Sequence, residues 1–436
     1  MPVALVVAGS LLTGAAAALV LVLVVFAGAS EPVITGAALV GFGSGWAILA
    51  LLTTRWTSQP QRWARVPAIA MAGSGVALLI TRPGNDVLTA ASWVWPPAAL
   101  GLAIWVARTA RRTTNRGGRW LVYPVVVLVT AAALGGTFAT VTLALDDTGD
   151  SMPGARYDVG GHRLHLNCIG TGSPTVVLEN GLNEISPLWS AVAAEVSHTT
   201  RVCAYDRVGQ GWSDDISRPQ DGNAVAADLH TLLERAGEHG PYVLAGHSSG
   251  GTLAMTYAAR YPAQVAGLVL LDSSSPHQYT DQPDFAGTYA MMRHVLPVMP
   301  ALARVAATRL IPASASPALS PEAAAQIQAF ITSPRGARNM RDEQSELRNV
   351  FAQAQALTTF DSKPLAVVTA RENNEGTKGW AAAQARMATL STNSIHWTAD
   401  TSHVGLLDER SGSQNSDRAI AAVVTAVRTG TPLTIR

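Results

Sequence analysis

The sequence predicts an α/β domain with a mostly parallel sheet over residues 146–436, preceded by an all-α transmembrane domain over residues 1–145. Three observations lead to this prediction. Long apolar stretches fill the first third of the chain, and short β-rich runs alternate with helical runs from about residue 155. One apolar run also leads into Gly246-His247-Ser248-Ser249-Gly250 and then into a helix-forming stretch. Strands that alternate with helices are typical of a mostly parallel sheet covered on both faces.

Five apolar stretches carry the transmembrane prediction. Most approach the roughly 20 residues that a helix needs to cross the hydrocarbon core of a bilayer, and the third is the shortest. They cover residues 3–28, 33–54, 66–81, 88–107 and 121–145. None contains Asp, Glu, Lys or Arg, which argues against an ion pathway and favours an anchor or a lipid-facing module.

Arginines between these stretches predict the orientation. Clusters at residues 55–65 and 108–119 fall on the same side of the membrane when five segments cross it. The positive-inside rule makes that side cytoplasmic, so the α/β domain is expected on the extracytoplasmic side of the cell membrane. Residues 1–145 hold nine arginines and two acids, but no basic run interleaves with aromatic residues, so nucleic-acid binding has little support.

The α/β prediction rests on candidate strands and helices in alternation. Strands are expected at residues 163–169, 175–179, 201–205, 242–246, 267–272, 364–370 and 394–399. Helices are expected at residues 187–197, 223–236, 251–261, 380–391 and 417–428. A helical, Ala- and Met-rich stretch with several prolines, about residues 277–360, interrupts the alternation. An insertion between two strands of such a sheet is well placed to be a lid over a site.

The Gly-x-Ser-x-Gly run predicts a nucleophile. A serine hydroxyl is a weak nucleophile at neutral pH and must stand where a base can reach it. A sharp turn from strand to helix exposes Ser248 in this way, and the close approach of the two elements leaves little room for a Cβ at Gly246 and Gly250. The alternative is an ordinary glycine-rich turn in an α/β domain.

Four histidines follow Ser248 and are candidates for the base. His277 and His294 lie at the start of the expected lid, and His396 lies in a strand-like run where a packed or edge position is expected. His403 follows the last strand in a loop before the final helix, from which an imidazole can reach over the serine. His403 is therefore the predicted general base.

An acyl-transfer site also needs two backbone amides for the developing oxyanion. The residue after the nucleophile, Ser249, offers one. The other is expected in the turn after strand 175–179, where Leu182 is the first choice and Asn183 the second. A simple strand-ending turn is the alternative.

These motifs resemble those of the α/β-hydrolase superfamily, and most closely those of a bacterial branch of serine hydrolases with an N-terminal membrane region. The resemblance covers about residues 155–430. It rests on residues 202–213 (VCAYDRVGQGWS), 240–251 (GPYVLAGHSSGG), 267–276 (GLVLLDSSSP) and 401–403 (TSH). It implies the α/β-hydrolase fold with a helical lid, Ser248 as nucleophile, His403 as base, and the Leu182 and Ser249 amides as oxyanion donors.

The acid of the expected triad departs from the superfamily pattern. Asn373 occupies the usual position at the end of strand 364–370, with Ala370 in place of a preceding glycine. An amide can orient an imidazolium but cannot neutralise its charge. Glu372 is adjacent and could substitute, whereas Asp272 ends the preceding strand, from which some superfamily members draw their acid. We favour Asp272 slightly, and Glu372 remains the alternative.

Two further pairs of residues stand out. The resemblance places Asp206 and Arg207 on the turn after strand 201–205, where an ion pair that fixes the turn is expected and a catalytic pair is the alternative. The resemblance places Cys168 and Cys203 on neighbouring strands, so a disulfide is sterically plausible and an extracytoplasmic compartment would permit it. Two free thiols are the alternative.

The sequence as a whole predicts a membrane-anchored, multi-pass serine hydrolase that cleaves carboxylic esters and contacts membrane lipids. Apolar lid residues favour a lipophilic small-molecule ester or lipid as substrate. No cofactor or metal is implied, and a serine in place of an aspartate at position 248 argues against dehalogenase and epoxide-hydrolase chemistry. The alternatives are an acyltransferase that uses the same residues and a catalytically inactive binding or receptor module.

Overall fold

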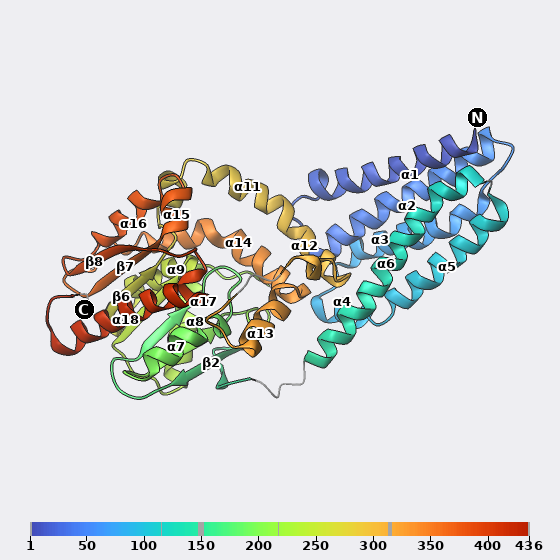
Figure 1. The fold of residues 1–436 in the computed structure, drawn as a ribbon. Helices are drawn as coiled ribbons and strands as arrows, with labels where there is room; N and C mark the ends of the chain where they lie inside the picture. Colours follow the sequence, from blue (N-terminus) through green and yellow to red (C-terminus); the bar gives the residue numbers. More distant parts are fainter. Residues whose placement is uncertain (1, 115, 147–151, 217, 313–315, 435–436) are drawn as a thin grey trace. The chain divides into compact units, whose positions relative to one another are not determined.

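The computed structural model describes residues 2–434 apart from residues 115, 147–151, 217 and 313–315 (Figure 1). The chain forms two compact units. The first comprises residues 1–149, 291–312 and 332–338, and the second comprises residues 150–290, 313–331 and 339–436. Two parts of the expected lid, residues 291–312 and 332–338, therefore belong to the first unit.

The N-terminal region of the first unit is helical. Its helices are α1 (Val3–Val20), extended by a π-helical turn, α2 (Glu31–Trp56), α3 (Arg65–Thr81), α4 (Asn85–Ala91), α5 (Trp95–Thr113) and α6 (Arg116–Asp146). Among the described residues, four helices are long and apolar enough to cross a membrane, and the number rises to five if the bent pair of α4 and α5 is one span. The region is thus compatible with the predicted five spans.

Small residues allow close helix packing in this unit. A Cβ added at Gly41 of α2 would lie 2.3 Å from the backbone nitrogen of Ala18 in α1. A Cβ at Gly36 would lie 2.7 Å from the carbonyl oxygen of Gly75 in α3. Glycines at such crossings let helix backbones approach, which favours association of apolar helices without a hydrophobic driving force.

A segment of the expected lid packs against these helices. It contains α12 (Met299–Arg304), and a Cβ at Gly135 of α6 would lie 2.2 Å from the carbonyl oxygen of Val305 just after it. Glu31, at the first position of α2, is 1% exposed and forms ion pairs with Arg304 and, at 3.6 Å, with Arg338. Arg304 also donates to Ser92 Oγ at 3.2 Å. The first unit thus combines the apolar helices with part of the insertion.

Replacing Glu31 with Gln is expected to destabilise the first unit by about 3–5 kcal/mol, because it would leave the largely buried guanidinium of Arg304 without its carboxylate partner. Thermal unfolding of the detergent-solubilised protein, followed by tryptophan fluorescence, measures the effect. Asp86→Asn is the matched control, since Asp86 is the other acid of residues 1–145 and is exposed on α4. Equal melting temperatures for Glu31→Gln and wild type would contradict the expected role of this ion pair.

The second unit contains an eight-stranded sheet in the order β1-β2-β4-β3-β5-β6-β7-β8. The strands are β1 (Ala155–Asp158), β2 (Arg163–Ile169), β3 (Val176–Glu179), β4 (Val202–Asp206), β5 (Tyr242–His247), β6 (Val265–Leu271), β7 (Leu365–Ala370) and β8 (Ser394–Ala399). β2 is antiparallel to β1 and β4, and all other neighbouring strands are parallel. The mostly parallel sheet is confirmed. The prediction missed β1, a short edge strand whose exposed and half-buried residues alternate.

Helices cover both faces of the sheet. They are α7 (Ser190–Ser197), α8 (Gly222–Arg235), α9 (Ser249–Arg260), α16 (Trp380–Ala388), α17 (Gly405–Asp408) and α18 (Arg410–Thr429). α8, α9 and α16 share one hydrophobic core with side chains such as Val177, while α7, α17 and α18 share another with Val176 and Leu178. Successive side chains of β3 therefore point to opposite faces, and both faces are buried.

The remaining helices belong to the insertion or to the strand ends. They are α10 (Gln278–Asp281), α11 (Phe285–Val295), α13 (Pro321–Ile331), α14 (Pro334–Ala354) and α15 (Arg371–Gly376). The chain leaves the sheet after β3, β5, β6, β7 and β8 through the segments that carry the predicted site residues. Because these strands are parallel, their carboxyl ends lie at one edge of the sheet, where α/β proteins commonly bind ligands.

Candidate active site

Ser248 lies at the turn between β5 and α9 in a conformation that few residues other than glycine adopt, with φ 55° and ψ −126°. Such strain persists where the surroundings hold it. Here the Ser248 amide donates to the Leu271 carbonyl at 3.1 Å, and the Ser274 amide donates to the Ser248 carbonyl at 2.9 Å. A Cβ at Gly250 would lie 2.3 Å from the carbonyl oxygen of Glu179. The packing expected around the turn is therefore present.

His403 lies in the loop between β8 and α17, and its imidazole contacts Asp272. Nδ1 of His403 lies 2.6 Å from Oδ2 of Asp272, which directly follows β6 and has φ 42°. The ring centroid of His403 is also 4.5 Å from that of His247, the residue before Ser248. The sheet thus brings His403 both to Asp272 and to the turn that carries Ser248.

The Asp272 carboxylate is fully buried and accepts hydrogen bonds on both oxygens. Oδ1 accepts from the Ala370 amide at 3.0 Å and from Trp380 Nε1 at 2.7 Å. Oδ2 faces His403 and accepts from Asn373 Nδ2 at 2.6 Å. Donors on both oxygens fix the orientation of the carboxylate.

Glu372 takes a different place from Asp272. Its Oε2 accepts from the backbone amide of His403 at 2.7 Å. Asn373, which occupies the usual acid position, lies with its Nδ2 3.1 Å from His403 Nδ1 while it donates to Asp272. Of the two carboxylates left open by the sequence, Asp272 contacts the imidazole and Glu372 contacts the backbone of the same histidine.

The loop after β3 carries the predicted oxyanion donors. The Gly181 amide donates to Glu184 Oε2 at 2.5 Å, and the Asn183 amide donates to Glu343 Oε2 at 2.7 Å. The amides of Leu182 and Ser249 have no hydrogen-bond acceptor within the described part of the chain. The amide of Leu182, the first candidate from the sequence, is therefore available as a donor, whereas the amide of Asn183 already donates to Glu343.

Sequence reasoning missed an ion pair beside the serine. Nδ1 of His247 lies 2.6 Å from Glu184 Oε1, and its Nε2 lies 2.9 Å from the carbonyl oxygen of His403. Both neighbours are acceptors, an arrangement that favours a proton on each ring nitrogen and therefore the cationic form of His247. The only signal in the sequence was the position of His247 next to Ser248, because Glu184 lies 63 residues away.

The pKa values of this pair follow from burial and charge. Burial alone lowers the pKa of His247, but the Glu184 carboxylate and the hydrogen bonds outweigh it and raise the pKa above its usual value. Burial alone raises the pKa of Glu184, yet the charge and hydrogen bond of His247 bring it below its usual value. Both shifts favour the ionised pair, which holds the backbone of His403 in place.

The prediction of an ion pair between Asp206 and Arg207 is wrong. Asp206 is fully buried and contacts His165 Nδ1 at 2.8 Å, and it accepts from the Ser186 amide at 2.7 Å. Arg207 instead contacts two glutamates, Glu179 and Glu343. Both side chains fix loops at the strand ends, but each does so through residues far away in the sequence, which no local pattern reveals.

A disulfide links Cys168 of β2 and Cys203 of β4, which are register partners on these antiparallel strands. The question that the sequence left open is thereby answered in favour of the disulfide. The bond lies within the sheet, whereas the strand ends carry the candidate site.

A pocket in the second unit is lined by Leu182 and Ser249. Its wall combines charged with apolar side chains, which include Arg207, Glu343, Val225, Leu253, Leu347 and Val350. The two candidate oxyanion donors therefore border one cavity of mixed polarity.

Comparisons with known proteins agree with the fold. A family model described as the alpha/beta hydrolase fold matches residues 174–320. The solved structure of the haloalkane dehalogenase DbeA from Bradyrhizobium elkani covers 64% of this chain and 99% of its own, with a TM-score of 0.51 and 18% identity. At that identity the likeness concerns the fold alone.

Two curated relatives match shorter segments. An uncharacterized protein of Schizosaccharomyces pombe is 32% identical over 171 residues, which cover 32% of this chain and 32% of that protein. Lipase LipV of Mycobacterium tuberculosis is 38% identical over 110 residues, which cover 25% of this chain and 41% of the lipase. The matched segments span less than half of either relative.

Proposed function

Because the chain belongs to the α/β-hydrolase superfamily, we propose that it is a serine hydrolase that cleaves carboxylic esters through an acyl-enzyme on Ser248. One observation carries the proposal. The His403 imidazole contacts the buried Asp272 carboxylate on one side and packs against His247, the chain neighbour of Ser248, on another. A nucleophile, a base and an orienting acid in this relation are the parts that acyl transfer needs.

The proposed reaction has two steps. Ser248 Oγ attacks the ester carbonyl carbon while His403 Nε2 takes the hydroxyl proton, and the carbonyl oxygen becomes an oxyanion that the Leu182 and Ser249 amides stabilise. The leaving alkoxide takes the proton from His403, and the acyl group stays on Ser248. Water, deprotonated by His403, then attacks the acyl carbon. The bond from this carbon to Ser248 Oγ breaks, Oγ takes the proton back from His403, and the acid is released. Asp272 keeps the proton on Nδ1 and stabilises the imidazolium in both steps.

The proposed substrate is a lipophilic ester. The pocket beside Leu182 and Ser249 has an apolar part formed by Val225, Leu253, Leu347 and Val350. A pocket of this kind binds an acyl or alcohol chain by burial of apolar surface. The likeness of one segment to a protein named a lipase supports the same class.

The proposed location is the extracytoplasmic face of the cell membrane. The arginine clusters at residues 55–65 and 108–119 support this orientation if five segments cross the bilayer. The disulfide between Cys168 and Cys203 supports an oxidising compartment.

Labelling with a fluorophosphonate tests the catalytic proposal. The probe reacts with an activated serine, so we expect one adduct on the full-length protein, mapped by peptide mass spectrometry to Ser248. Ser274→Ala, a variant of a serine close to Ser248 in the fold, should still be labelled. Folded wild type without an adduct, or with an adduct at another serine, would overturn the proposal and favour a binding module.

The same chemistry tests the location. A membrane-impermeant fluorophosphonate applied to intact cells is expected to label the protein to the same extent as in lysed cells. Labelling that appears only after lysis would place the domain in the cytoplasm.

Product analysis in the presence of an added alcohol separates hydrolysis from acyl transfer, since an acyltransferase would form the new ester in preference to the free acid.

A further inference from the structure

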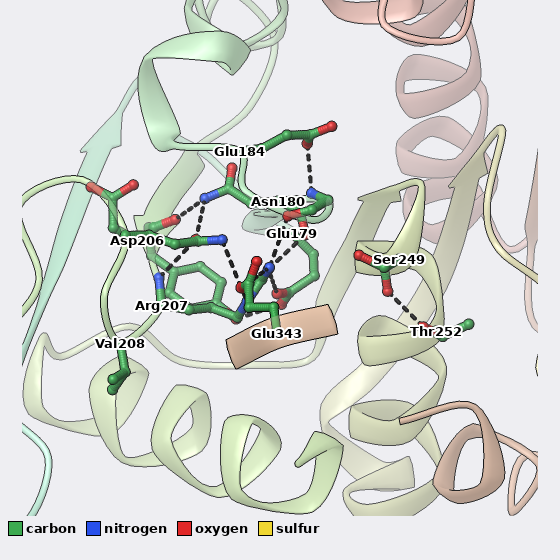
Figure 2. Close-up of polar contacts among 12 residues, drawn as sticks. Glu179, Asn180, Glu184, Asp206, Arg207, Val208, Ser249, Thr252 and Glu343 are labelled. Carbon is green, nitrogen blue, oxygen red and sulfur yellow. Dashed lines mark hydrogen bonds and ion pairs between the residues drawn. The ribbon is translucent and has the colours of Figure 1, made fainter. Parts of the chain in front are cut away.

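Arg207 contacts the backbone of the loop that carries the Leu182 amide. Its side chain, on the turn after β4, is 5% exposed. Nη1 donates to the Asn180 carbonyl at 2.6 Å, and Nη2 donates to the Gly181 carbonyl at 2.8 Å. Figure 2 shows the guanidinium at the strand ends, between Glu179 and Glu343. Both carbonyls are thus held by charge-assisted hydrogen bonds, which are stronger than neutral ones.

The bond to the Gly181 carbonyl determines where the Leu182 amide points. The carbonyl of Gly181 and the N–H of Leu182 belong to one peptide unit, and this unit is trans. In a planar trans peptide, the C=O and N–H bonds point in opposite directions. Anchoring the carbonyl on Arg207 therefore directs the Leu182 N–H away from Arg207. A cation on the carbonyl also polarises the peptide and makes its N–H a stronger donor.

Glu343 of α14 holds the same loop on the other side of Leu182. Its Oε2 accepts from the Asn183 amide at 2.7 Å. Its Oε1 accepts from Arg207 Nη2 at 2.7 Å and from Gln210 Nε2 at 3.0 Å. The peptide before Leu182 is thus fixed by Arg207 and the peptide after it by Glu343, and these two side chains are bonded to each other.

The two glutamates keep Arg207 charged in its buried position. Burial would lower the pKa of Arg207, but the carboxylates of Glu343 and Glu179 raise it above its usual range, so the guanidinium keeps its charge. Leu182, Ser249, Arg207 and Glu343 also line one pocket. The contacts therefore act at the wall of the cavity that the candidate oxyanion donors border.

We propose that Arg207 and Glu343 are positioning residues that aim the Leu182 amide at the substrate oxyanion, so that helix α14 of the insertion determines the quality of the oxyanion hole. This inference rests on the proposed function. The ion pair of Arg207 and Glu343 then affects the reaction rate in addition to the stability of the fold. The loop presents the Leu182 amide to the oxyanion only when α14 supplies Glu343.

The variant Glu343→Gln tests the proposal, because it keeps the shape of the side chain and removes the charge that Arg207 and the Asn183 amide share. We expect kcat for a short-chain ester to fall about 10- to 100-fold with KM nearly unchanged, which is less than the 100- to 1000-fold cost of removing a whole oxyanion donor. A trifluoromethyl ketone inhibitor forms an oxyanion on the serine, so its Ki should rise by the same factor as kcat/KM falls.

Glu346→Gln is the matched control. Glu346 lies on the same helix, and its carboxylate accepts a hydrogen bond from Asn349. We expect wild-type kcat and Ki for this variant. Arg207→Lys keeps the charge but not the planar fork, and it should lower kcat with the same proportional change in Ki.

The outcomes separate this inference from the proposed function. If wild type is labelled by the fluorophosphonate and Glu343→Gln keeps wild-type kcat and Ki, the inference is overturned while the proposed function stands. A loss of activity with unchanged Ki for the ketone would also overturn it, since the ion pair would then act only on the fold. If wild type is neither labelled nor active, the proposed function itself fails.

Discussion

Replacing Ser248 with alanine is expected to abolish ester hydrolysis, with a fall in kcat of about a million-fold. The variant removes the only group that can form the acyl-enzyme, and the residual rate comes from binding and from the oxyanion donors acting on water. Initial rates with a p-nitrophenyl ester, corrected for spontaneous hydrolysis, measure the effect. The strained backbone at position 248 accepts alanine as it accepts serine, since both carry one Cβ, so the fold should be preserved.

The partner of Ser248 is tested in the same series. His403→Ala is expected to lose about as much activity as Ser248→Ala, and the double variant no more than either, because residues that act as a unit are not additive. His277→Ala is the matched control, because His277 was a candidate base in the sequence and is exposed in the structure. Additive losses in the double variant, or a large loss in His277→Ala, would contradict the assignment of His403.

The strands and the serine turn could be predicted because their signals are local. β2 and β8 have the predicted bounds, and the other predicted strands differ by one or two residues at their ends. An apolar run followed by glycines identifies the turn at Ser248. The predicted last strand and final helix identify the loop between them, and this loop contains His403. Each of these predictions depends on a few consecutive residues.

The electrostatic contacts around the site could not be predicted, because they join residues that are far apart in the sequence and meet only in the folded domain. Glu343 and Arg207 are 136 residues apart, and they meet because the insertion returns to the end of β4. Arg207 was expected to bind its chain neighbour Asp206, yet consecutive side chains at a strand end point to opposite faces. The ion pairs of Glu31 with the insertion could not be predicted either, since a single acid beside an apolar stretch indicates only the end of a membrane span.

The choice of acid was also open for a structural reason. Asn373 stands at the usual position, and two carboxylates lie within reach of it in sequence or along the sheet. The structure separates them by the atom of His403 that each contacts, the ring nitrogen for Asp272 and the backbone nitrogen for Glu372. This difference predicts a large loss of kcat for one conservative variant and a small loss for the other.

Asp272→Asn is expected to lower kcat by about ten-thousand-fold with the fold intact. The Ala370 amide and Trp380 Nε1 both donate to Oδ1, so the oxygen of the introduced amide will stay on that side. Its NH2 group then faces His403 Nδ1 and donates to it. The imidazole must carry its proton on Nε2, where it can no longer accept the proton of Ser248.

Glu372→Gln is the matched comparison, and it is expected to cost tenfold or less, because one hydrogen bond contributes about 1 kcal/mol. The glutamine oxygen can still accept from the His403 amide, so the loop keeps its anchor. Steady-state kinetics of both variants, with circular dichroism to verify folding, distinguish the two carboxylates. A large loss in Glu372→Gln with near-normal activity in Asp272→Asn would assign the acid to Glu372, and the loop at His403 would then have to turn its imidazole away from the contact with Asp272.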